Sequence, residues 1–218
     1  MKHDLTEISD GKLYRSTDMA RLGCHDCAGC SDCCRDMDQS ITLDPYDIYL
    51  LTENLGCSFD DLINNGQIEF HIEEGLLLPN LKMVPKSIDL TRPPECYFLN
   101  SDGRCSIHSF RPGICRLFPL GRNYTDHRVS YFLLSNVCAV AHRDKVKISK
   151  WLGYAQIRDY ENFLESWHTL RAQVRDLVNN AADEQYSASI TTGFLKLFYQ
   201  QQYSGDFFEE YKRRVAQL

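Results

Sequence analysis

Four cysteines lie within eight residues of this chain, where positions 27–34 read CAGCSDCC, and Cys24 lies three residues upstream of the first of them. With 218 residues the chain can bury a hydrophobic core as one domain, so it does not need disulfides in order to fold. Its N-terminal sequence, MKHDLTEISDGK, lacks the apolar segment of a secretory signal, and we therefore expect the protein in the reducing cytoplasm. In that compartment, closely spaced cysteines indicate a metal site more often than disulfides. The cluster therefore predicts metal binding.

The charged residues divide the middle of the chain into an acidic and a basic part. Residues 36–81 contain ten Asp and Glu and no Lys or Arg, whereas residues 82–128 contain eight Lys and Arg against four acids. The basic part holds further cysteines, and its charge would balance a thiolate-rich site; two solvated faces of opposite sign are the alternative. We expect no nucleic-acid partner, because no basic stripe with interleaved aromatics is present. We also expect no membrane partner, since no apolar stretch approaches the roughly 20 residues of a membrane span.

The spacing of apolar residues and the turn signals predict an α+β, helix-rich fold. An irregular cysteine-rich metal-binding region with short β-hairpins is expected at residues 1–140, and a helical C-terminal region, residues 141–218, is expected to pack on it as one unit. Helix caps and Gly-containing turns place the individual elements. We expect helical segments at 42–56, 58–66, 147–181, 190–199 and 207–215, a hairpin of strands 67–73 and 76–84, a second hairpin at 96–107 and a strand at 127–135.

The spacing of the first cysteines is compatible with two kinds of metal site. Cys24, Cys27, Cys30 and Cys34 have the C-x2-C-x2-C-x3-C spacing that holds a cubane in bacterial ferredoxins, with Arg35 in place of the usual proline. For zinc, C-x2-C is an equally good half-site, so the spacing alone leaves iron and zinc open. Adjacent side chains diverge, which predicts that Cys33 and Cys34 serve different sites, or that one ligates while the other packs. A second, looser set follows, with gaps of eight, nine and 22 residues: Cys96, Cys105, Cys115 and Cys138.

Two blocks of the sequence resemble a known family. The motif CAGCSDCC and the later block CYFLNSDGRCSIHSFRPGICRLFPLG are similar to those of the CxxCxxCC family, the YkgJ-type cysteine cluster proteins, described as zinc- or iron-chelating domains. The resemblance covers roughly residues 20–140 and leaves Cys24 and Cys57 outside the metal set. The family includes flagellin lysine N-methylase, which implies an iron–sulfur protein acting on protein lysines with S-adenosylmethionine. The metal ligands that the resemblance implies are Cys27, Cys30, Cys33, Cys34, Cys96, Cys105, Cys115 and Cys138.

The leading hypothesis is a protein that binds an iron–sulfur centre, 4Fe-4S, with protein-lysine N-methyltransferase activity carried over from the resemblance. The competing hypothesis is a structural zinc module whose helical part binds a partner protein; the wide gaps of the second cysteine set favour iron, since structural zinc sites tend to pair two C-x2-C half-sites. Neither a Gly-x-Gly nucleotide fingerprint nor a C-x3-C-x2-C set is present, so S-adenosylmethionine would need an unusual ligand set. The acidic part could receive a substrate lysine between Tyr46, Tyr49 and Phe70, whose alternative role is core packing.

Several residues beside the cysteines have two interpretations each. Arginines near the cysteines could donate hydrogen bonds to sulfur or balance its charge, or they could make ordinary structural pairs. Imidazoles could replace a thiolate ligand on zinc or iron, and an isolated cysteine between helices is expected to behave as a small buried hydrophobe. The residues concerned are Arg35, Arg111 and Arg116, then His25 and His108, and finally Cys57.

Overall fold

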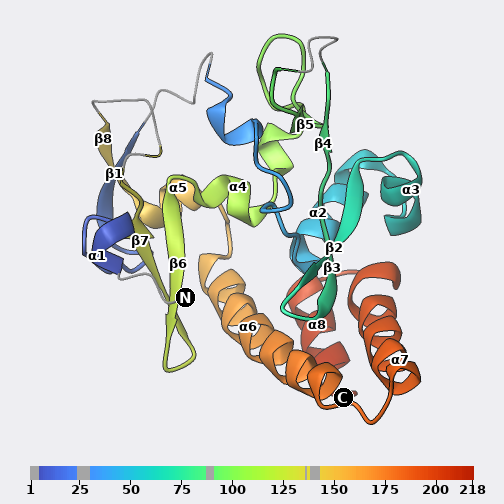
Figure 1. Cartoon of the computed structure of the whole chain (residues 1–218). Helices are drawn as coiled ribbons and strands as arrows, with labels where there is room; N and C mark the ends of the chain where they lie inside the picture. The colour runs from blue at the N-terminus through green and yellow to red at the C-terminus, as the bar shows by residue number, and fades with distance from the viewer. Residues whose placement is uncertain (1–4, 24–29, 87–90, 136, 138–142) are drawn as a thin grey trace.

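The computed structural model describes residues 5–23, 30–86, 91–135, 137 and 143–218. It confirms a mixed fold of helices and short antiparallel strand pairs with a helical C-terminal part (Figure 1). The helices are α1 (Leu5–Ile8), α2 (Pro45–Leu55), α3 (Phe59–Asn64), α4 (Gly113–Leu117), α5 (Ile148–Leu152), α6 (Ile157–Asn179), α7 (Glu184–Leu195) and α8 (Phe207–Val215), with 3-10 turns η2 (Asp32–Cys34) and η3 (His108–Phe110) and the π-turn η4 (Lys196–Gln200). The strands are β1 (Met19–Gly23), β2 (Ile68–Glu73), β3 (Leu76–Leu81), β4 (Met83–Val84), β5 (Glu95–Cys96), β6 (Leu120–Thr125), β7 (Arg128–Leu133) and β8 (Asp144–Lys147).

The strands form four antiparallel pairs, β1–β8, β2–β3, β4–β5 and β6–β7. The predicted β2–β3 hairpin is confirmed, and its two turn residues, Glu74 and Gly75, both have positive φ angles (52° and 90°), as a type I′ hairpin turn requires. The predicted strand at 127–135 is confirmed as β7, which pairs with β6 across a second such turn. None of the described helices has both the length and the apolar character needed to span a membrane.

The predicted hairpin at 96–107 is confirmed only in its central part, where the backbone N–H of Asn100 donates to the carbonyl of Arg104 and that of Ser106 to the carbonyl of Phe98, both at 2.8 Å. Only one bridge joins its two sides, between Leu99 and Cys105, and Cys96 pairs instead with Met83 of β4. At the turn, the Asn100 side chain accepts a hydrogen bond from the backbone N–H of Arg104 at 2.7 Å, which closes the loop.

Capping residues mark both ends of α2. Asp44 caps α2 in a reciprocal capping box with Asp47, and Gly56, at φ 64°, ends the helix. The expected helical stretch at 147–181 consists of two helices, α5 and α6, because Gly153 adopts a left-handed conformation (φ 70°) between them. The predicted helix at 207–215 is confirmed as α8.

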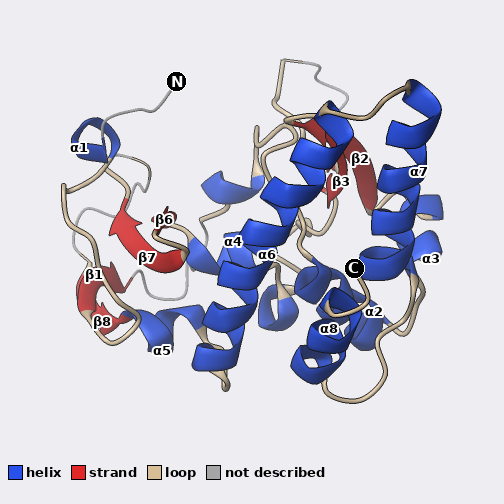
Figure 2. Cartoon of the chain, turned by 90° about the horizontal axis from the view of Figure 1, so that it is seen from below, coloured by secondary structure: helices blue, strands red, loops and turns tan. Residues whose placement is uncertain are grey.

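The main hydrophobic core lies between α2, α3, the β2–β3 hairpin and the three C-terminal helices α6, α7 and α8 (Figures 1 and 2). Aromatic rings fill much of it; the Trp167 ring stacks on Phe194 with centroids 5.3 Å apart. A smaller cluster joins β1, β7, α4 and α5. Both clusters draw residues from either side of position 140, and the division into two regions at that position stays a prediction.

Candidate metal centre

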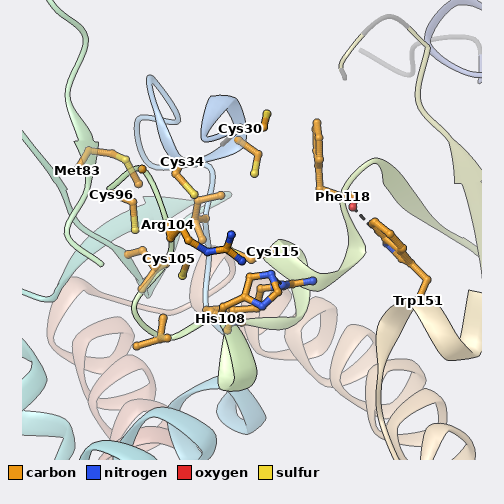
Figure 3. Close-up of a pocket in the computed structure, with 17 residues that line it drawn as sticks. Cys30, Cys34, Met83, Cys96, Arg104, Cys105, His108, Cys115, Phe118 and Trp151 are labelled. Carbon is orange, nitrogen blue, oxygen red and sulfur yellow. Dashed lines mark hydrogen bonds between the residues drawn. The ribbon is translucent and has the colours of Figure 1, made fainter. Parts of the chain in front are cut away.

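One cavity of about 90 Å³ gathers cysteines from three separate parts of the chain (Figure 3). The η2 turn and the residue two positions before it supply the first group, the β5 region the second, and α4 the third. Long-range contacts rather than sequence proximity therefore build the site. The cysteines that line the cavity are Cys30, Cys33, Cys34, Cys96, Cys105 and Cys115.

The first cysteine segment is held against β5 by Arg35. Its guanidinium forms an ion pair with Glu95 and donates to the Ser31 hydroxyl at 3.0 Å, and its backbone pairs with that of Glu95 in an isolated bridge. The next residue, Asp36, donates its backbone N–H to the carbonyl of Pro94 at 3.0 Å. These contacts bring the η2 turn to the strand that carries the next cysteine.

The second segment places Cys96 and Cys105 on the cavity by two short pairings. Cys96 is 6 % exposed and pairs with Met83, so β4 supplies an apolar wall beside it. Cys105 follows the tight turn that Asn100 closes, and its bridge to Leu99 fixes its position.

The third segment, α4, carries Cys115 at its third residue. Its N-cap, Pro112, offers no side-chain acceptor, and the first helical N–H, that of Gly113, donates instead to the Asp47 carboxylate at 2.7 Å. Asp47 is 2 % exposed and lies at the start of α2, so this contact connects the main core to the helix that carries the cysteine.

The adjacent thiols of Cys33 and Cys34 face the same cavity. Cys34 donates a hydrogen bond to Cys33, which, with help from the charge of Arg111, lowers the pKa of Cys33 to about 7 and raises that of Cys34. Both belong to one short 3-10 turn and line the same cavity. The structure thus brings together two side chains that were expected to diverge.

Three further cavity thiols have raised pKa values. Burial raises the pKa of Cys96, Cys105 and Cys115, most strongly for Cys115, so without a bound cation these thiols stay protonated. Each of the seven cysteines that the structure describes is free of disulfides. Thiols arranged in this way are available to bind a metal group, whose positive charge would compensate the negative charge of the thiolates formed on binding.

Cationic and apolar side chains complete the lining of the cavity. Arg104, His108 and Arg111 belong to the lining, and Arg111 pairs with His108 while its Nε lies buried without an acceptor in the described part of the chain. Arg116, for which both a role toward sulfur and an ordinary structural pairing were open, donates to the backbone carbonyl of Arg111 at 2.9 Å and to that of Ser109. The apolar members, which no local sequence signal marks, are Ile41, Leu81, Met83, Ile107, Phe118 and Trp151.

The remaining candidate residues lie elsewhere. Cys57 is half-buried against the main core at the end of α2, and it does not line the cysteine cavity. Tyr46 and Tyr49 stack on each other and pack with Phe207, and Phe70 packs against Phe59, so these aromatics belong to the core. Four other candidates, Cys24, Cys27, Cys138 and His25, fall outside the described residues.

The cysteines surround the cavity without meeting at one point. Among residues 5–23, 30–86, 91–135, 137 and 143–218, no three His, Cys, Asp or Glu side chains converge closely enough to hold a single metal ion. No carboxylate lines the cavity within those same ranges. Among the described residues, the sulfur donors are therefore spread over the lining of the cavity.

Comparison with known proteins agrees with this chemistry. The model of the CxxCxxCC family, described as "Putative zinc- or iron-chelating domain", matches residues 26–139, which is more than half of the chain. The protein therefore belongs to the CxxCxxCC family, and its cysteine region is a zinc- or iron-chelating domain. Neither the curated proteins nor the solved structures yielded a match.

Proposed function

We propose that the cavity binds an iron–sulfur cluster of the 4Fe-4S type. The observation that carries this proposal is the six cysteines lining one cavity of about 90 Å³. A structural zinc site closes four ligands around one ion at about 2.3 Å per Zn–S bond and leaves no such space. Thiolates are the usual ligands of iron–sulfur clusters. A group of several atoms therefore fits the cavity better than a lone ion does.

The proposed ligands are drawn from the cavity cysteines and from two cysteines that the family resemblance adds. Four thiolates hold one cubane, so eight cysteines leave room for a second metal position or for spare thiols. Burial favours Cys96 and Cys115 as ligands, since a cluster at that depth is shielded from water. The full proposed set is Cys27, Cys30, Cys33, Cys34, Cys96, Cys105, Cys115 and Cys138.

Metal analysis under anaerobic conditions tests this proposal. Protein purified without oxygen or chelators, and then reconstituted with iron and sulfide, should be brown and should contain iron and acid-labile sulfide in equal amounts. Substituting Cys33, Cys96 or Cys115 by Ser should remove most of both, whereas Cys57→Ser, a half-buried cysteine away from the cavity, should leave them unchanged. Colourless protein that holds one or two zinc ions and takes up no iron would support the structural zinc module with a partner protein.

A catalytic role rests on the family resemblance alone and is proposed second. In protein-lysine N-methylation, the methyl group leaves the sulfonium of S-adenosylmethionine, a bond forms to the lysine nitrogen, and that nitrogen loses a proton. The substrate would be a protein with an exposed lysine. Tyr46, Tyr49 and Phe70 do not support this role, because they pack in the core. Equilibrium dialysis of labelled S-adenosylmethionine with cluster-loaded protein tests it: no binding by a protein that holds its cluster would leave cluster binding as the function.

A further inference from the structure

Asp47 makes two different contacts with its carboxylate. One oxygen accepts the backbone N–H of Asp44 at 3.1 Å, which completes the capping box of α2. The other accepts the backbone N–H of Gly113 at 2.7 Å, 66 residues further along the chain. The second contact supplies α4 with the cap that Pro112 lacks.

Side chains pack closely around the start of α4. A Cβ atom at Gly113 would overlap the Tyr160 hydroxyl, and it would lie 2.9 Å from Arg122 Nη2 and 3.1 Å from the Tyr154 hydroxyl. Arg122 in turn donates to Tyr160 at 2.9 Å, so two of the groups that enclose the glycine also hold each other. Asp47 thus holds the helix start against closely packed side chains.

Cys115 lies two residues beyond Gly113 and belongs to the same short helix. We propose that Asp47 is a positioning residue of the cysteine cavity: its hydrogen bond to Gly113 fixes α4 and thereby sets where the Cys115 sulfur lies among the other thiols. The inference rests on the proposed function, because its effect is read on a bound iron–sulfur cluster. Outer residues that orient ligands are typically worth about 10-fold or more in metal affinity.

The alternative is that Asp47 serves α2 alone, and the chain offers a matched control for that role. Asp61 completes the capping box of α3 in the same manner, accepting the backbone N–H of Ser58 at 2.9 Å. Within the described residues, its carboxylate accepts hydrogen bonds from Ser58 only. Asp61→Ala therefore removes a capping box without touching the cavity.

The experiment compares wild type, D47A, D47N and D61A after anaerobic reconstitution. For each protein the rate of cluster transfer to an iron chelator is followed by visible absorption, and the reduced cluster is examined by electron paramagnetic resonance. We expect D47A to lose its cluster about 10-fold faster and with a changed resonance signal. D61A should match wild type, and D47N should remain close to it, since its amide oxygen still accepts the N–H of Gly113.

The outcomes separate the two proposals. If wild type takes up its cluster, and D47A and D61A release theirs at the same rate and with the same resonance signal, then the positioning role is overturned and cluster binding is not. A D47N protein that loses its cluster as fast as D47A also overturns the positioning role. D47N keeps an oxygen that accepts the N–H of Gly113, so loss of that acceptor would then not explain the faster release. A wild type that takes up no cluster overturns the proposed function itself. If D47A does not fold, Asp47→Ser takes its place. The serine hydroxyl lies one bond closer to the backbone than the carboxylate oxygens of Asp47, so this variant keeps a polar group and still shortens the reach toward Gly113.

Discussion

Arg35 and Glu95 are joined twice, by an ion pair between their side chains and by a bridge between their backbones. Arg35 directly follows the Cys33–Cys34 pair, and Glu95 directly precedes Cys96. The two contacts therefore hold the first and second cysteine segments together.

Glu95→Gln should weaken the site more than it weakens the fold. The Arg35 side chain is 38 % exposed, and pairs of this kind contribute on the order of 1 kcal/mol or less to stability. Cluster release to a chelator should nevertheless be faster, because the first cysteine segment loses its anchor on β5. The control is Glu209→Gln on α8, which breaks an exposed pair with Lys212. Equal release rates for the two variants would contradict the prediction.

Gly113→Ala should destabilise the protein because the new methyl group has no space. It would overlap the Tyr160 hydroxyl, and overpacking of this kind costs about 1–3 kcal/mol. Gly193→Ala in α7 is the matched control, since no atom lies within 4 Å of a Cβ placed there. That change should stabilise the protein by about 0.5–1 kcal/mol, the cost of glycine inside a helix. Urea unfolding of both variants measures the two effects, and a Gly113→Ala protein as stable as wild type would show that the helix start can shift.

Much of the local structure could be predicted because its signals lie within a few residues of each other. Asp44 before Pro45 marks the start of α2, and Gly56 marks its end. Glu74 and Gly75 between two apolar runs mark the β2–β3 turn. Strands β1 and β8 could not be predicted, because their pairing joins Met19 to Lys147, which are far apart in the chain. In addition, neither sequence, MARLG or DKVK, shows a clear alternation of apolar and polar residues.

The candidate metal site also has features that the sequence could predict and features that it could not. The family resemblance, not cysteine spacing, implied the set of eight ligand cysteines; six of them line one cavity, and the other two, Cys27 and Cys138, fall outside the described residues. The contact between Asp47 and Gly113 has no sequence signal, since a capping carboxylate looks the same whether or not it also reaches another helix. Comparing Asp47 with Asp61 makes this plain: both complete capping boxes, and only the fold distinguishes them.

Stability should depend on pH through the buried carboxylates of Asp44 and Asp47. Burial raises the pKa of both, and for Asp47 the nearby Asp44 charge helps to raise it to about 8. An unfolded aspartate releases its proton near pH 3.9, so between about pH 4 and pH 8 the folded protein retains a proton that the unfolded chain has lost. This contribution to stability therefore falls as pH rises through that window.

The D47N variant isolates the effect, since the amide that replaces the carboxyl does not titrate. The free energy of unfolding of wild type minus that of D47N should fall by at least about 1.4 kcal/mol between about pH 5 and about pH 8, the worth of one pKa unit. Urea titrations of both proteins at the two pH values give this difference. A difference that rises with pH would mean that the charged carboxylate, held by its hydrogen bonds and by Arg122, is the stable form in the fold.

Cys24 and Cys27 decide between the two ligand sets that the sequence allows. A ferredoxin-like set uses Cys24, Cys27, Cys30 and Cys34 together, whereas the family set leaves Cys24 out and adds the cysteines of the second block. The cavity favours the family set, because Cys96, Cys105 and Cys115 line the same wall as Cys30 and Cys34. Cys24→Ser should therefore keep the iron and sulfide content of wild type, while Cys27→Ser should lose most of both. If Cys24→Ser strips the metal as completely as Cys27→Ser, and Cys96→Ser does not, then the ferredoxin-like set holds the cluster and the second block only encloses it.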